Sequence, residues 1–178
     1  MAILGVDDFK SKLKGGGARA NLFKATINFP PNSTPPSGIV ELASFMCKAA
    51  VLPASTVASV EVPFRGRVIK VAGDRTFEPW NVTIINDTDF AVRNAMEAWM
   101  NTINQHRNNT GLTNPQSYQA DLLVDQLDKD GTVLKRYTFR GCFPTSVEAI
   151  QVSYDQTNVI EEFGVVFEVQ YWESNTTT

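Results

Sequence analysis

The side chains that most often perform catalysis are few in this sequence, and their spacing does not suit it. His106 is the only histidine, and it lies in a polar, asparagine-rich stretch with no Cys, Asp or Glu at the spacing of a metal site. A histidine triad or a histidine-bound metal is therefore not expected. Glu161 and Glu162 are neighbours on a predicted strand, so their carboxylates point to opposite faces and cannot share one acid–base site.

Two further patterns resemble ligand sites only in outline. The stretch Asp128-Lys129-Asp130-Gly131 has residues of a calcium loop, but Gln126 stands where the first ligand is needed, so we interpret it as a turn. Gly15-Gly16-Gly17 follows no strand and precedes no Lys-Ser/Thr, which indicates a hinge rather than a phosphate-binding loop. Cys47 and Cys142 fit neither a metal spacing nor a disulfide framework, and we interpret both as small buried hydrophobes. The sequence thus predicts no enzyme, no metal site and no cofactor.

The composition is that of a single globular domain and does not favour binding to nucleic acid. The chain has 178 residues, of which 43% are hydrophobic, and its net charge is −3. Since no global basic field is present, stable nucleic-acid binding is not expected. No apolar run reaches the ~18 residues of a membrane span, and an apolar start followed by lysines is the reverse of a secretory signal. We therefore expect no membrane anchor and folding in a cytoplasm.

Charge is divided unevenly along the chain. Residues 1–89 contain 10 Lys/Arg and 8 Asp/Glu, whereas residues 90–178 contain 6 and 11, so the halves differ as +2 and −5. In a self-associating protein this asymmetry would bring opposite signs together head to tail. Ordinary solvated surface charge is the alternative interpretation.

Alternation of apolar and polar residues with a period of two dominates the sequence and predicts a mainly β fold, a barrel-like or sandwich-like sheet. The predicted strands cover 23–29, 45–51, 80–84, 118–128, 132–142 and 162–171, with two more in 56–72 on either side of a Pro63-Phe64-Arg65-Gly66 turn. The dipeptide Asp130-Gly131 is expected to close the hairpin formed by 118–128 and 132–142. In the last strand, Phe163 to Tyr171 place every second residue on one apolar face.

Helical spacing is clear in one segment, at about 89–104. Its apolar residues fall on one face, and Asp87, Thr88 or Asp89 can accept the first free backbone N–H groups. These apolar residues are Val92, Ala95, Met96, Trp99 and Ile103. A shorter helix is predicted from Val6 to Leu13, ended by the three glycines. We expect one domain over 1–178, with an N-terminal arm at 1–17, a proline-rich loop at 30–44 and a flexible tail at 173–178.

Five blocks of the sequence are distinctive when taken together. They are Phe45–Ala54, Ile69–Asp87, the helix carrying Trp99, Gly141–Thr145 and Phe163–Trp172. These blocks cover most of the chain, and their residues are similar to those of the tail tube proteins of T4-like contractile bacteriophages.

The resemblance implies a structural subunit. It implies six-membered rings of this chain that stack into a hollow tube inside a contractile sheath, through which the genome passes into the host cell. The implied partners are other copies, the sheath, baseplate and tail-terminator proteins, and, transiently in the lumen, the tape-measure protein and double-stranded DNA. The implied location is the virion, after assembly in the host bacterial cytoplasm. Two alternatives stay open: a tube subunit of a phage-tail-like particle that injects protein, and a monomeric ligand-binding β-barrel.

Two groups of residues are candidates for contact between subunits. The first is Gly73, Asp74 and Arg75, where a tight turn is one interpretation, with Gly73 at a positive φ, and an ion pair to a neighbouring subunit is the other. The second is Phe9 and Leu13, the apolar side of the short N-terminal helix. A helix of this length is marginal alone, so it must pack on a surface, either of an adjacent subunit or of its own barrel.

The lumen of a tube would be lined by polar residues opposite an apolar row of the same strands. We expect five such residues to face it: Lys24, Thr26, Asn28, Glu168 and Gln170.

Overall fold

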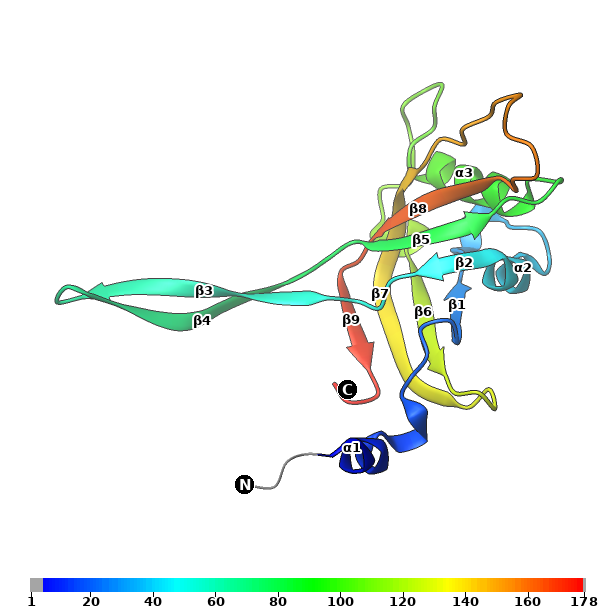
Figure 1. Ribbon diagram of the computed structural model, residues 1–178. Helices are drawn as coiled ribbons and strands as arrows, with labels where there is room; N and C mark the ends of the chain where they lie inside the picture. Colours follow the sequence, from blue (N-terminus) through cyan, green and yellow to red (C-terminus); the bar gives the residue numbers. More distant parts are fainter. Residues whose placement is uncertain (1–4, 178) are drawn as a thin grey trace.

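A curled antiparallel sheet forms the body of the protein in a computed structural model that describes residues 5–177 (Figure 1). The strands follow the order β1-β6-β7-β8-β5-β2, and β9 pairs with β7 on the edge opposite to β6. Their bounds are β1 Phe23–Ile27, β2 Cys47–Ala50, β5 Trp80–Ile85, β6 Ala120–Leu127, β7 Val133–Val147, β8 Glu162–Glu168 and β9 Tyr171–Ser174. The long β7 pairs with β6 and β9 near its start and with β8 near its end, so the two parts of the sheet wrap around one core. The predicted mainly β, barrel-like or sandwich-like class is confirmed.

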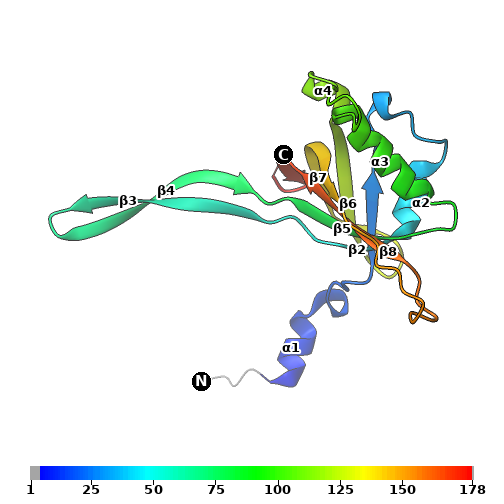
Figure 2. The same cartoon turned by 90° about the horizontal axis from the view of Figure 1, so that it is seen from above.

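Three helices cover one side of this sheet, opposite a long hairpin (Figure 2). They are α2 (Ile39–Met46), α3 (Ala91–Ile103) and α4 (Pro115–Tyr118). The core between them and the sheet is filled by aromatic side chains. The ring of Trp80 lies 4.6 Å from Phe139, and Phe167 lies 5.8 Å from Trp80 and 5.9 Å from Trp99. All four side chains are at most 2% exposed.

The predicted central helix is confirmed as α3. Four of the five residues on its predicted apolar face are buried: Val92, Ala95, Met96 and Trp99. The N-cap residue is Phe90, and of the three candidates it is Asp87 whose side chain accepts a hydrogen bond from the first helical N–H, that of Ala91, at 2.9 Å. The hairpin of β6 and β7 is also confirmed, with Gly131 at a φ of 84° in its turn.

The segment before β2 differs from the prediction. Helix α2 occupies residues that we expected to belong partly to a loop and partly to a strand, and the short 3-10 helix η2 (Pro31–Ser33) precedes it. Ile39 and Ala43 are one helical turn apart and both buried, which draws this segment onto the core as a helix. As a result the strand begins only at Cys47, and Phe45 is 77% exposed.

The predicted last strand is broken in two. Strand β8 ends at Glu168, Gln170 lies in a bend, and β9 then pairs with an earlier part of β7. The break lies beside Gly141, which has a φ of 62° and where β7 changes partner. Tyr171 is 45% exposed, so its predicted place in the buried row is wrong.

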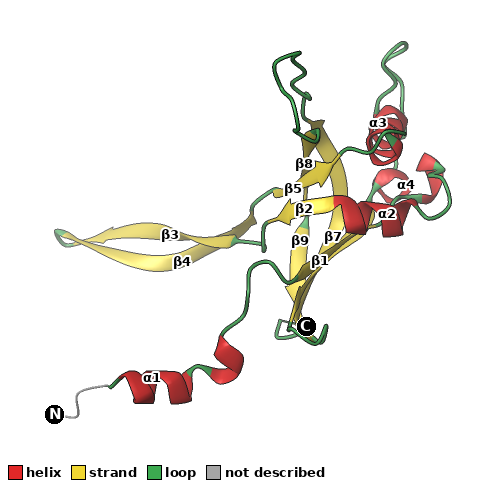
Figure 3. Cartoon of the chain, turned by 45° about the vertical axis from the view of Figure 1, so that its right-hand side comes forward, coloured by secondary structure: helices red, strands yellow, loops and turns green. Residues whose placement is uncertain are grey.

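Two segments extend away from the body (Figures 1 and 3). The first is the hairpin of β3 (Ser55–Phe64) and β4 (Arg67–Phe77), a two-stranded sheet of its own. Its turn is the pair Arg65 and Gly66, both at positive φ, and Pro63 belongs to the strand, so the turn is shorter than predicted. The second is the arm formed by α1 (Val6–Lys12) and the 3-10 helix η1 (Lys14–Gly16). No helix among the described residues is both long and apolar enough to cross a membrane.

Candidate assembly surfaces

The β3–β4 hairpin has one apolar face and one polar face. Directly opposite residues share a face, and Val60 pairs with Val71 while Val62 pairs with Ile69. Together with Phe64 these residues form the apolar face, and each is between 46% and 58% exposed. The other face has the pair Glu61 and Lys70, with 3.5 Å between carboxylate and ammonium. The sequence predicted two strands here, and the structure shows that almost all their residues are exposed and that no core lies against them within residues 5–177.

Such a hairpin is incomplete by itself. A two-stranded sheet is at best marginally stable in water and needs a third strand or another packing surface. Contiguous apolar patches on a monomer usually mark a site of association. The apolar face of this hairpin therefore needs a partner, and the main packing of β3 and β4 is against each other.

Gly73 and Asp74 lie within β4 rather than in a tight turn, which corrects that part of the prediction. The register shifts here, so that Val57 pairs with Arg75 but Ser59 pairs with Ala72, leaving two residues of β4 opposite one of β3. This is a β-bulge, which twists the hairpin. A Cβ at position 73 would lie 3.0 Å from the Ala58 carbonyl oxygen, so the glycine serves close approach of the strands rather than a positive φ.

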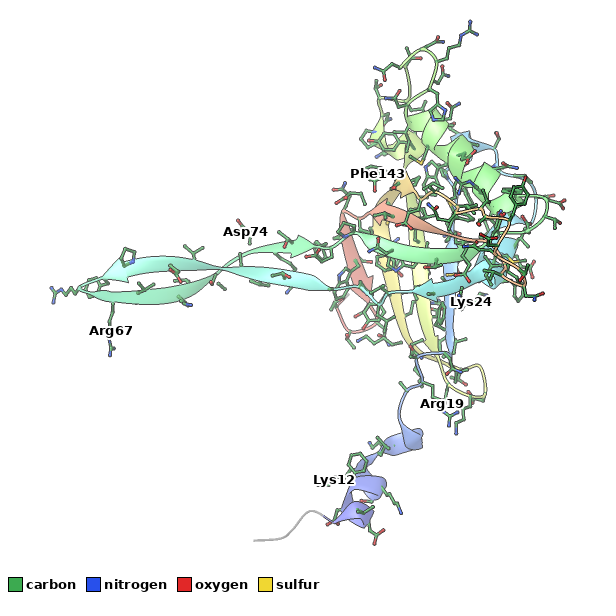
Figure 4. All side chains as sticks on the ribbon, turned by 45° about the horizontal axis from the view of Figure 1, so that its top comes forward. Lys12, Arg19, Lys24, Arg67, Asp74 and Phe143 are labelled. Atoms are coloured by element: carbon green, nitrogen blue, oxygen red, sulfur yellow. The ribbon has the colours of Figure 1, made fainter. Side chains whose placement is uncertain are left out.

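Asp74 and Arg75 are exposed along the hairpin, and Figure 4 shows Asp74 well away from the body. In the part of the chain that the structure describes, neither side chain has an ion-pair partner. Both are thus placed where another copy can reach them, and their pairing with another subunit stays a prediction.

The N-terminal arm leaves its apolar side uncovered. Helix α1 begins at Val6 as predicted, is followed by the glycine-rich η1, and has no buried residue. Phe9 is 66% exposed and Leu13 43% exposed. Figures 1 and 2 both show α1 apart from the body, so within a single chain the helix does not dock on its own barrel.

Three of the five residues predicted to face the lumen share one polar face of the sheet. Lys24, Thr26 and Asn28 point away from the core, since Ala25 and Ile27 between them are fully buried. Lys24 is the register partner of Asp125, and the Asn28 amide donates to the Asp121 carbonyl at 2.7 Å. We call this surface the polar face: Lys24, Thr26, Asn28, Asp121, Asp125, Arg136, Arg140 and Glu173.

Charges on the polar face are paired. The Arg136 guanidinium binds both oxygens of Asp125, at 2.7 and 2.8 Å, and these hydrogen bonds raise the pKa of Arg136 above its ordinary value. Arg140 joins Asp121 at 2.6 Å to Glu173 at 3.1 Å, which likewise raises the pKa of Arg140. With Lys24 included, three basic and three acidic side chains share this surface, so its net charge is zero.

Glu168 and Gln170 are not in one row with the other three. Glu168 is on β8, which β6 and β7 separate from β1 in the sheet. Gln170 is in the bend before β9, close to Gly141 at the margin of the polar face. Sequence reasoning missed the four paired side chains Asp121, Asp125, Arg136 and Arg140, although their spacing of four residues along predicted strands places each pair on one face.

Comparison with known proteins finds relatives that match most of the chain. A family model described as "Phage tail tube protein" matches residues 18–175. The tail tube protein gp19 of Enterobacteria phage T4 is 34% identical over 170 residues, which cover 94% of this chain and 99% of that protein. Two solved structures share the fold at low sequence identity. A chain of the anti-feeding prophage baseplate has a TM-score of 0.62 at 11% identity, covering 89% of this chain and 95% of that one. A chain of the sheath–tube complex of an extracellular contractile injection system has a TM-score of 0.58 at 12% identity, covering 96% and 97%.

Proposed function

The chain belongs to the phage tail tube protein family, and from this membership we propose that its copies form rings of six that stack into the hollow tube of a contractile tail. Genome passage through that tube into the host cell is the proposed role. The observation that supports assembly most directly is the exposed apolar face of the β3–β4 hairpin, because it needs a partner that its own chain does not provide.

The polar face is our proposed wall of the lumen. A conduit for double-stranded DNA must not hold the phosphates, and binding to DNA grows with the number of phosphates that Lys and Arg neutralise. Here Arg136 and Arg140 are engaged by carboxylates of the same face, and the face has no net charge. We propose that Glu168 and Gln170 also face the lumen, at the margin of the polar face on the side of β8.

The proposed partners follow from the family. They are the sheath, baseplate and tail-terminator proteins, with the tape-measure protein in the lumen before DNA. The fold likeness to chains from a sheath–tube complex and from a baseplate supports this proposal. We propose that the tube assembles in the host bacterial cytoplasm and remains in the virion.

The identity of 34% to a phage protein favours DNA over protein as the cargo. Because Trp80, Trp99, Phe139 and Phe167 fill the core, we favour a tube subunit over a barrel that binds a ligand inside.

Negative-stain microscopy of the purified protein tests the proposed function. We expect rings with sixfold symmetry at moderate concentration and stacked tubes at higher concentration, because association through many equal contacts depends on protein concentration. Discrete monomers at high concentration in every salt condition would contradict the proposal.

Removal of the N-terminal arm is expected to stop growth of tubes without unfolding the body. Deletion of residues 1–17 removes α1, whose Phe9 and Leu13 are exposed and which we propose to pack on an adjacent subunit. Circular dichroism should show an unchanged β spectrum, while microscopy should show rings with short or absent stacks. A double variant, Phe9→Ser with Leu13→Ser, should reproduce the deletion, whereas Ser11→Ala on the opposite face of the same helix keeps the charge of the arm and serves as the control. Tubes of normal length from the truncated chain would eliminate this role of the arm.

A further inference from the structure

Charge is divided between the extended segments and the body. The arm and the hairpin, residues 1–22 and 55–77, together hold 8 Lys/Arg and 4 Asp/Glu. The rest of the chain holds 8 Lys/Arg and 15 Asp/Glu, so the two parts differ as +4 and −7 within the total of −3. Segments that need a partner are therefore basic, and the body that could receive them in another copy is acidic.

The tip of the hairpin is both basic and apolar. Phe64 is 58% exposed and Val68 is 56% exposed, and Arg65 and Arg67 lie between them in sequence. The Arg65 guanidinium lies 5.3 Å from the centre of the Phe64 ring. Neither arginine forms an ion pair within residues 5–177. Figure 4 shows Arg67 near the far end of the hairpin.

The loop between β7 and β8, residues 148–161, has the complementary character. It contains Glu148, Asp155 and Glu161 and no Lys or Arg, and none of the three carboxylates pairs with a cation among the described residues. Three of its apolar side chains are turned to solvent, with Val152 77%, Val159 66% and Ile160 67% exposed, whereas Ile150 packs against the core. Val159 and Ile160 line a hollow of about 480 Å³ in this loop, which has room for an aromatic side chain.

These two features lie on opposite sides of the body. Figures 1 and 2 both show the hairpin leaving on one side and the loop of residues 148–161 projecting on the other. The hairpin tip therefore cannot touch the loop of its own chain. A contact between the tip of one chain and the loop of another joins two different surfaces. Such a head-to-tail contact continues from copy to copy, as stacking requires.

We propose that the hairpin tip of one copy, Phe64 to Val68, docks in the hollow of the β7–β8 loop of a copy in the next ring. This inference rests on the proposed tube function and names the surface that receives the hairpin. Phe64 fills the hollow beside Val159 and Ile160, and Arg65 and Arg67 meet Asp155 and Glu161. The alternative is that the hairpin docks on another part of the body, such as the groove beside α2 lined by Val40 and Phe45. The cross-linking experiment below distinguishes the β7–β8 loop from these alternatives.

Cross-linking of a double cysteine variant, Val68→Cys with Val159→Cys, tests the contact. Both positions are exposed, so neither change affects the fold. A short bismaleimide applied to tubes should give a ladder of covalent multimers on a denaturing gel, because each tip is joined to the next copy. The native Cys47 and Cys142 are buried, and burial raises their pKa to about 11 and about 12, so they stay protonated and react slowly.

The matched control is Val68→Cys with Asn108→Cys, in which the second cysteine lies in a different exposed loop. It should give no multimers beyond occasional dimers. Charge reversal gives a second readout: Arg67→Glu or Asp155→Arg alone should raise the concentration needed for tubes by about fivefold, and the two together should restore it. Normal tubes without a ladder, or an equal ladder from the control, would overturn this inference while leaving the tube function intact. Unmodified protein that forms neither rings nor tubes would overturn the proposed function and the inference with it.

Discussion

Replacing Val62 and Ile69 with aspartate should abolish tube formation at concentrations where the unmodified protein assembles completely. The two residues are register partners at the centre of the apolar face of the hairpin, and both are about half exposed in the single chain. Burial of an aliphatic side chain contributes about 1.5–3 kcal/mol. About half of each side chain is already covered in the single chain, so the loss of both contributions weakens each contact by about 1.5–3 kcal/mol. This corresponds to a rise of about 10-fold to 100-fold in the concentration needed for assembly, before the cost of burying two carboxylates is added.

The same variant should leave the body intact, because the hairpin packs mainly on itself. We expect an unchanged melting temperature of the body and a loss of tubes in sedimentation and negative-stain microscopy. The matched control is Ser59→Asp with Ala72→Asp, which adds the same charge to a register pair on the polar face of the hairpin. Equal loss of assembly in the control would show that added charge, and not the apolar face, is responsible.

Replacement of Trp99 with alanine should destabilise the folded body by about 3–5 kcal/mol, as expected for a fully buried tryptophan. Its ring lies 5.5 Å from Phe29 and 5.9 Å from Phe167, and its indole N–H donates to the Tyr118 carbonyl at 2.7 Å. Trp99 thus joins α3 to α4, to Phe29 just after β1 and to Phe167 near the end of β8. Equilibrium unfolding in urea measures the loss.

Trp99→Phe separates the two contributions. It keeps an aromatic ring in the core but leaves the Tyr118 carbonyl without its donor, so about 1–2 kcal/mol is expected. If Trp99→Ala lowered the free energy of unfolding by less than the 1–2 kcal/mol expected for Trp99→Phe, the core would have rearranged to fill the space, and Trp99 would not be central to it.

The parts of the fold that the sequence predicted well are those whose pattern and packing lie within one chain. The β6–β7 hairpin has a turn signal at Asp130-Gly131 and strands that pair with each other, and α3 has one buried face. Helix α2 was missed because the prolines and glycine before it indicated a loop, while Phe45 and Cys47 happened to fit a period of two. Only the burial of Ile39 and Ala43 shows that the helical period is the relevant one.

The candidate assembly surfaces were harder to predict, for a different physical reason. Alternation in the β3 and β4 segments indicates that one face is covered, but it is the same whether the cover belongs to the same chain or to another copy. Gly73 is similar: a glycine beside an aspartate suits a turn, yet here it allows two strands to approach at a bulge. Pairing on the polar face depends on which strands are neighbours, and that order is set by the whole sheet.

The hairpin leaves the body on one side only, and this has a consequence for the ends of any stack that it bridges. At one end of such a stack the hairpins of the last copies have no partner, whereas at the other end the surfaces that would receive a hairpin are unoccupied. The two ends are therefore chemically different, and a cap that fits one of them cannot fit the other. Addition of copies at the two ends can then be controlled separately. A short peptide with the sequence of the hairpin would occupy the receiving surfaces and block growth at that end, while the other end stays free to grow.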